Sequence, residues 1–241
     1  MNSIYKHIKA SVSNRKRLLA VLIDPDKMAV NHVASFIFKL NASKATHIFV
    51  GGSTVNGSIT EDIVKEIKEH TQLPVVLFPG DTNQITNKAD GILFLSLISG
   101  RNSEYLIGKH VKAVSELRGT ELEVIPTGYL LINGGNETAV ERVTETKPLD
   151  QSNVQCIVDT AKAGELLGKQ LIYLEAGSGA KEHVALDVIN QVKKELNVPL
   201  IVGGGIRTKL QLENVYESGA DLVVIGTAFE EDESFFEDLK K

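Results

Sequence analysis

The sequence contains a single cysteine, Cys156, so no internal disulfide can form. A chain without disulfides suits a reducing compartment, and we therefore expect this protein to be cytoplasmic. Because Cys156 lies beside Val154, Ile157 and Val158, we expect a buried helix thiol rather than a reactive one.

Long apolar runs are also absent. No segment approaches the roughly twenty apolar residues that span a bilayer, and the charged N-terminal segment is unlike a secretory signal. The formal net charge is -5, so no basic excess is available to neutralise phosphates, and nucleic acid is not an expected partner. The six histidines show neither the spacing nor the clustering of a zinc site. The composition is instead that of a globular protein, 42% hydrophobic and 24% charged.

Eight short apolar or β-branched runs recur along the chain. They are continuous rather than alternating, as expected of strands that are buried on both faces. Segments with helical spacing lie between most of them, and no break in composition divides residues 1–241. This order predicts one domain, a closed (β/α)8 TIM barrel, with a doubly wound open sheet as the alternative. The expected strands cover residues 18–24, 46–53, 74–80, 91–99, 123–132, 171–177, 199–205 and 222–228.

Two connections depart from this rhythm. The segment 80–90 is at the lower limit for a parallel crossover, so the helix after the third strand should be reduced or replaced by a loop. The fifth strand is followed by a long polar stretch, 133–151, which is a candidate lid or interface element because loops after strands carry the chemistry of such barrels. In the helical segment 60–71, Thr60 is expected to cap the start.

The last three strands all end in small residues. In TIM barrels the loops after strands seven and eight often form a phosphate site together with the start of a short helix. Backbone N–H groups that no side chain obstructs can converge on phosphate oxygens. A turn with positive φ would explain one such loop, but three at neighbouring strand ends favour a phosphate site. The residues concerned are Gly177, Ser178, Gly179, Gly203, Gly204, Gly205, Gly226 and Thr227.

Acidic and hydroxyl side chains follow the first two strands. Asp24 and Asp26 flank a proline after the first strand, and the second strand ends in the segment 51–54, which contains Ser53. Carboxylate oxygens suit magnesium, although Asp-Pro-Asp is also ordinary turn chemistry. A metal site beside a phosphate pocket would suit two phosphorylated substrates.

Glu175 ends the sixth strand, and alternation places Tyr173 on the same side. A carboxylate there could take a proton from a substrate hydroxyl while Tyr173 supplies a hydrogen bond. Alternatively, Glu175 pairs with a lysine or arginine as structural support. Two other functions also fit the glycine loops: a phosphosugar isomerase or lyase, and a barrel that only binds a phosphorylated ligand. The first would usually carry a Schiff-base lysine or a second acid–base residue on a middle strand, and we find no convincing lysine there.

Six segments, in order over nearly the whole chain, resemble signature segments of the geranylgeranylglyceryl phosphate synthase family, which includes bacterial heptaprenylglyceryl phosphate synthases. They are LIDPDK, GGST, NKADGILFLSLIS, YLEAGSGA, VGGGIR and DLVVIGTA. The stretch GYLLINGGNETAVERVT is similar to the larger subgroup of archaea and some bacteria, whose members use geranylgeranyl diphosphate and often form hexamers. The resemblance implies a prenyltransferase that joins the C3 hydroxyl of sn-glycerol 1-phosphate to a polyprenyl diphosphate. It also implies a homo-oligomer, with a hexamer favoured over a dimer.

The resemblance further implies roles for individual residues. Asp24 and Ser53 become ligands of Mg2+, and Glu175 becomes the base for the C3 hydroxyl. We also expect the lost third helix to open a lateral groove for the prenyl chain, whose length, geranylgeranyl or heptaprenyl, stays open. The implied cradle for glycerol phosphate comprises Tyr173, Leu174, Glu175, Ala176, Gly177, Ser178, Gly179, Gly204, Gly205, Gly226 and Thr227.

Overall fold

The computed structural model of the protein describes residues 3–52 and 57–240. Eight parallel strands form a closed barrel in sequence order, and β8 pairs back to β1. The predicted TIM barrel is therefore confirmed, and the open sheet is excluded. The strands are β1 (Leu18–Ile23), β2 (His47–Val50), β3 (Val75–Leu77), β4 (Gly91–Leu97), β5 (Glu123–Leu131), β6 (Leu171–Glu175), β7 (Leu200–Gly203) and β8 (Leu222–Ile225).

Each strand lies inside its predicted range but ends earlier than predicted. β6 ends at Glu175, β7 at Gly203 and β8 at Ile225, whereas the sequence suggested ends at 177, 205 and 228. The reason is local, because Gly177 and Gly204 have φ angles of 104° and 84°, which an extended strand cannot accommodate. The glycine-rich segments therefore lie in loops at the carboxyl rim.

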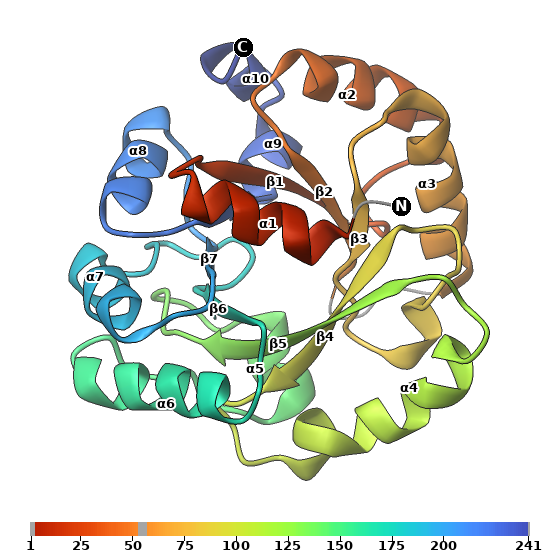
Figure 1. Cartoon of the computed structure of the whole chain (residues 1–241). Coiled ribbons are helices and arrows are strands. Elements are labelled where there is room, and N and C mark those ends of the chain that lie inside the picture. Colours follow the sequence, from red (N-terminus) through yellow and green to blue (C-terminus); the bar gives the residue numbers. More distant parts are fainter. Residues whose placement is uncertain (1–2, 53–56, 241) are drawn as a thin grey trace.

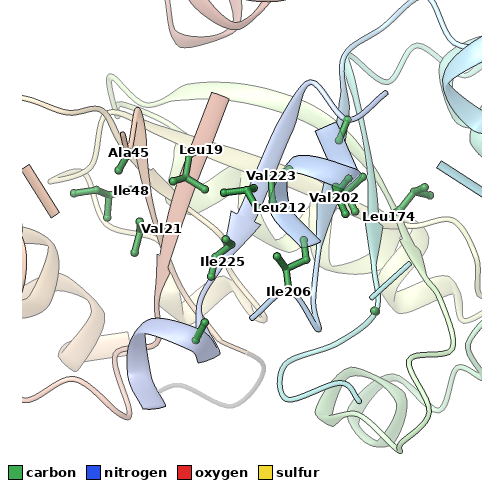
Figure 2. Close-up of a cluster of buried hydrophobic side chains, with 14 of the residues drawn as sticks. Leu19, Val21, Ala45, Ile48, Leu174, Val202, Ile206, Leu212, Val223 and Ile225 are labelled. Atoms are coloured by element: carbon green, nitrogen blue, oxygen red, sulfur yellow. The ribbon is translucent and has the colours of Figure 1, made fainter. Parts of the chain in front are cut away.

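Buried side chains form two layers on either side of the barrel wall. One cluster fills the interior and includes Phe49, Tyr129 and Tyr173. The other lies between the strands and the surrounding helices, and Figure 2 shows part of it. Strands with both faces covered need continuous apolar runs, which is why the sequence pattern identified them. The labelled strand residues of the outer layer in Figure 2 include Leu19, Val21, Ile48, Leu174, Val202, Val223 and Ile225.

Helices surround the barrel, as Figure 1 shows. After β3 there is only one 3-10 turn, η1 (Thr82–Gln84), so the predicted loss of the third helix is confirmed. The polar stretch after β5 contains the short helix α5 (Ala139–Thr144). None of the helices in the described part of the chain is long and apolar enough to cross a membrane. The remaining helices are α2 (Val30–Ala42), α3 (Gly57–His70), η2 (a π-helix, Glu104–Gly108), α4 (Lys109–Leu117), α6 (Val154–Leu166), α7 (Leu186–Glu195), α8 (Lys209–Glu217), α9 (Thr227–Glu231) and α10 (Phe235–Asp238).

The first helix, α1 (Ile4–Ser13), lies across the barrel end opposite the glycine loops (Figure 1). Ile4 and Ile8 belong to the interior cluster and close this end with apolar side chains. Glu123, at the start of β5, accepts hydrogen bonds from the backbone N–H groups of Ile4 and Tyr5. This end of the barrel is therefore closed, and the opposite rim, where the glycine loops lie, is the end at which a site can form.

Two local predictions were wrong. Cys156 is exposed on α6, because the buried face of that helix is formed by Ile157, Val158 and Ala161 and Cys156 falls outside it. Adjacent apolar residues suggested burial, but helical periodicity decides it. Thr60 lies inside α3, which begins at Gly57, so it does not cap the helix.

The start of β2 carries a buried histidine close to α1. His47 is fully buried; its Nδ1 lies 2.8 Å from Thr46 Oγ1, while its Nε2 has no partner within the described structure. The ring of His7 lies 6.0 Å away, centroid to centroid. Burial, and then the charge of His7, lower the pKa of His47 to about 3.

This shift predicts a loss of stability in mild acid. The unfolded chain takes up a proton near pH 6.5, whereas folded His47 stays neutral, so the free energy of unfolding should fall by about 2 kcal/mol between pH 7 and pH 5 from this group. Chemical denaturation at both pH values would measure it. In the variant His47→Phe the drop should be smaller by that amount; an equal drop in both proteins would contradict the prediction.

Candidate active site

Glu175 is the last residue of β6 and points to the interior side of the carboxyl rim. Its side chain is almost entirely buried, with 6% of the residue exposed. The backbone N–H of Gly177 donates a hydrogen bond of 2.7 Å to Glu175 Oε1. No lysine or arginine among residues 3–52 and 57–240 pairs with this carboxylate, so structural ion pairing does not explain it.

Tyr173 lies one layer below Glu175 on the same side of the strand. Its ring stacks on Phe78, with centroids 5.5 Å apart, and meets Tyr129 edge-on at 5.4 Å. The hydroxyl is buried and makes no hydrogen bond of standard geometry in the part of the chain that the structure describes, but it lies close enough to the Glu175 carboxylate to interact with it. An unpaired buried hydroxyl is costly, so this one is available for a partner that enters from above.

The surroundings shift both side chains toward their protonated forms. Burial raises the pKa of Glu175, and the interactions with the Tyr173 hydroxyl and then with the N–H of Gly177 only partly oppose it. Burial, followed by the negative charge of Glu175, raises the pKa of Tyr173 well above its ordinary value. Glu175 is therefore a stronger proton acceptor than an exposed carboxylate, and Tyr173 remains a donor.

The end of β7 and the loop after it pack against this pair so closely that only glycine fits at residues 203 and 204. A Cβ on Gly203 would lie 2.5 Å from Tyr173 Oη and 2.8 Å from Glu175 Oε2. A Cβ on Gly204 would lie 2.5 Å from Glu175 Oε1 and 2.7 Å from the nitrogen of Gly177. The absence of a Cβ at these two positions thus allows the backbone to approach the Glu175 carboxylate closely. Gly204 also adopts a positive φ, which favours glycine.

The loops after β6 and β8 meet at the same rim. Ser178 Oγ lies 3.3 Å from Thr227 Oγ1, and the N–H of Gly179 donates to that oxygen at 3.3 Å. Thr227 is the first residue of α9, whose first N–H groups have no partner inside the helix. Backbone N–H groups and hydroxyls from the loops after β6 and β8 are therefore gathered beside the glycines that follow β7, as an anion site requires.

A cavity of about 460 Å³ opens at this rim and includes most of the expected site. Tyr173, Leu174, Ala176, Gly179 and Gly203 are not part of its lining; Leu174 and Ala176 instead pack in the outer apolar layer. The expected residues that line the cavity are Asp24, Glu175, Gly177, Ser178, Gly204, Gly205, Gly226 and Thr227.

The metal site expected after β1 and β2 is only partly described. Asp24 lines the cavity and accepts the N–H of Asp26 at 3.1 Å, whereas Asp26 itself is exposed and outside the lining. The expected pair of acids is thus reduced to one. Burial raises the pKa of Asp24, against the effects of that N–H and of Lys27, whose Nζ lies 3.7 Å away. Ser53 lies outside the described residues.

The cavity lining extends to residues beside the short connection that replaces the third helix and to Ile92 of β4, which belongs to the outer apolar layer. This lining fits the lateral groove expected from the short connection. Apolar side chains after η1, on β4 and on α4 form its walls; they include Ile85, Ile92, Phe94, Leu95 and Ala113. A single cavity thus joins a polar rim that can bind an anion to an apolar groove that can bind a chain.

Two parts of the cavity lining were not identified as site residues from the sequence. Residues 137–140 and 142–144, in the stretch after β5, line the cavity. Thr138 packs so tightly on the loop after β6 that a Cβ on Gly177 would come within 2.3 Å of its Cγ2. Tyr105 and Lys109, from η2 and α4, line the groove. In the sequence these residues belong to ordinary amphipathic segments. Their apolar face, which turns inward, is the only feature that could have identified them as part of the cavity lining.

Comparison with known proteins agrees with this geometry. The PcrB family model matches residues 11–241. Geranylgeranylglyceryl phosphate synthase of Zunongwangia profunda is 61% identical over 226 residues, 94% of this chain and 96% of the relative, and that of Flavobacterium johnsoniae is 52% identical over 237 residues, 98% of each. The crystal structure of (S)-3-O-geranylgeranylglyceryl phosphate synthase from Thermoplasma acidophilum in complex with sn-glycerol-1-phosphate superimposes with a TM-score of 0.93 at 33% identity, covering 99% of this chain and 96% of that one. These similarities confirm the resemblance found in the sequence, and the chain belongs to the PcrB family.

Proposed function

We propose that this protein is a geranylgeranylglyceryl phosphate synthase, which joins the C3 hydroxyl of sn-glycerol 1-phosphate to geranylgeranyl diphosphate and releases diphosphate. The observation that carries the proposal is the continuous cavity, which holds a glycine-lined anion site, a buried carboxylate and an apolar groove. Relatives of this name align over nearly the whole chain, and the Thermoplasma acidophilum enzyme of the same fold binds sn-glycerol-1-phosphate.

The reaction needs little more than positioning and one proton transfer. The phosphate of sn-glycerol 1-phosphate binds the loops that contain Gly177, Gly204 and Thr227, which brings its C3 hydroxyl to Glu175. Glu175 takes the hydroxyl proton as the C3 oxygen forms a bond to the allylic carbon of the prenyl group. The bond from that carbon to the diphosphate oxygen breaks, and diphosphate leaves with the bonding electrons.

Tyr173 has a supporting role in this scheme. Its hydroxyl is buried beneath Glu175, with which it interacts, does not line the cavity and makes no hydrogen bond of standard geometry within the described ranges. Its high pKa keeps the proton on the tyrosine, so it can donate to Glu175 or to a substrate oxygen that reaches it. Phe78 and Tyr129 hold the ring from both sides, which fixes the direction of the hydroxyl.

Magnesium fits the donor set at the end of β1, beside the loop after β8. A protein commonly holds Mg2+ through one or two carboxylates while substrate phosphates and water complete the shell. Asp24 supplies one cavity-lining carboxylate, and we assign Ser53 as the second ligand from the resemblance. When bound, the ion neutralises the charge that develops on the departing diphosphate.

Asp24→Asn should lower kcat/KM roughly a hundredfold, because the metal loses the one cavity-lining carboxylate that we assign to it. Steady-state rates over a range of Mg2+ concentrations would show this as a raised metal requirement, and EDTA should abolish activity in the wild type. Asp26→Asn is the matched control, since Asp26 lies two residues away but outside the cavity. If Asp24→Asn keeps the wild-type metal dependence, Asp24 is not a ligand.

The proposed reaction is tested by incubating purified protein with Mg2+, sn-glycerol 1-phosphate and, separately, farnesyl, geranylgeranyl or heptaprenyl diphosphate. We expect the prenyl ether, identified by its mass, with geranylgeranyl diphosphate. Ether formed only from heptaprenyl diphosphate would retain the reaction and change the chain length. Folded protein that forms no ether with any chain would refute the proposal.

We also propose a homo-oligomer, with a hexamer favoured over a dimer, in the cytoplasm. Several large apolar side chains are solvent-exposed, including Phe38 at 79% and Leu166 at 78%. A partner subunit would remove such surface from water. The single cysteine, which excludes an internal disulfide, supports the cytoplasmic assignment.

A further inference from the structure

Side chains from three separate segments are linked beside the short connection that replaces the third helix. Asp81, in the loop after β3, forms an ion pair with Lys109 of α4, with Oδ2 and Nζ 2.6 Å apart. The same ammonium lies 4.7 Å from the ring centroid of Tyr105. Tyr105 in turn donates a hydrogen bond of 3.1 Å to the carbonyl oxygen of Val143 on α5. All four residues line the cavity.

The ion pair lies at the border between the groove and solvent. The Asp81 side chain is 51% exposed and the Lys109 side chain only 22%, so the lysine is the more enclosed partner. Partial burial of Asp81 opposes ionisation, but the hydrogen bonds from Lys109 and Thr82 and the charge of Lys109 together outweigh it and lower the pKa of Asp81. Asp81 also accepts the N–H of Thr82 at 2.7 Å, which ties the ion pair to η1.

A lysine beside an apolar groove needs such partners. The groove is bounded by Phe94, Leu95 and Ala113, and an unpaired ammonium facing them would be costly. The carboxylate of Asp81 and the face of Tyr105 both compensate that charge. The segment that presents Tyr105, η2, is a π-helix, a rare form that occurs frequently at functional sites.

We propose that Asp81, Lys109 and Tyr105 form a clasp that closes the lateral groove and positions the distal part of the prenyl chain against β4. This inference rests on the proposed function and specifies how the enzyme holds the prenyl diphosphate. The clasp does not touch the glycine loops or Glu175, so it acts on chain binding and not on proton transfer. Its contribution therefore grows with the length of the prenyl chain.

The test compares geranyl, farnesyl and geranylgeranyl diphosphates at saturating sn-glycerol 1-phosphate and Mg2+. Lys109→Met keeps most of the aliphatic stem and removes the charge, and Asp81→Asn keeps the shape of its partner. Each should lower kcat/KM for geranylgeranyl diphosphate on the order of fivefold, with little change for geranyl diphosphate. The charge-exchanged double variant Asp81→Lys/Lys109→Asp should recover part of the loss. Lys112→Met is the matched control, because Lys112 lies on α4 like Lys109 and pairs with Glu104 of η2, but does not line the cavity.

The outcomes separate the clasp from the proposed function. Wild-type protein that makes no ether would overturn the proposed function and the clasp together. If the wild type is active, equal losses with all three chains, or a raised KM for sn-glycerol 1-phosphate, would show a merely structural role and overturn the clasp. Unchanged rates in both single variants would do the same. Thermal unfolding verifies that each variant is folded, and Lys109→Gln replaces Lys109→Met should the latter fail to fold.

Discussion

Glu175→Gln is expected to lower kcat about a thousandfold, because a buried amide cannot accept the proton of the C3 hydroxyl. The amide has nearly the same shape as the carboxylate, so the affinity for sn-glycerol 1-phosphate should change little. Single-turnover rates with geranylgeranyl diphosphate, combined with calorimetric binding of sn-glycerol 1-phosphate, would separate the two effects. Tyr173→Phe, which keeps the packed ring, should cause a smaller loss.

The pH dependence provides an independent check on the same residue. Burial raises the pKa of Glu175, so the wild-type rate should decline as the pH falls through a value above that of an ordinary glutamate. Glu175→Gln lacks this ionisable group, so its residual rate should not decline over the same acidic pH range. A Glu175→Gln enzyme that retains a tenth or more of wild-type kcat would exclude Glu175 as the base.

Gly204→Ala is expected to have the second large effect, a fall of at least about a hundredfold in kcat/KM. Its Cβ would lie 2.5 Å from Glu175 Oε1 and 2.7 Å from the nitrogen of Gly177, so either the carboxylate or the phosphate loop must move. We expect most of the loss in the KM for sn-glycerol 1-phosphate, measured in steady state.

Gly119→Ala is the matched control for Gly204→Ala. Both glycines have a φ of 84°, but a Cβ on Gly119 would meet nothing within 4 Å. The backbone strain of about 1–2 kcal/mol is thus common to both variants, and only Gly204→Ala adds the collision. Equal activity in the two variants would show that close approach at Gly204 is unimportant.

The sequence was sufficient to locate the barrel and the rim of the site. Parallel strands covered on both faces require continuous apolar runs, and the small residues that follow them mark the loops. Glu175 could be identified because it stands between such a run and such a loop. The strand ends were placed too late, since an apolar or glycine residue after a strand does not reveal its φ angle, as Gly177 shows.

Contacts between distant elements were not accessible from the sequence. Asp81 and Lys109 are 28 positions apart, and neither residue type nor spacing shows that they meet across a missing helix. The burial of Ile4 and Ile8 inside the barrel depends on where α1 docks, which local periodicity does not specify. Cys156 was misassigned for a related reason, because its exposure depends on which face of α6 packs against the barrel.

The most direct test of the central claim is a crystal structure of the protein with sn-glycerol 1-phosphate. We predict the phosphate at the loops of Gly177, Gly204 and Thr227, with the C3 hydroxyl within about 2.6–3.2 Å of a Glu175 oxygen. A phosphate bound instead beside Asp24, or a C3 hydroxyl directed away from Glu175, would contradict the assignment of the cradle and the base.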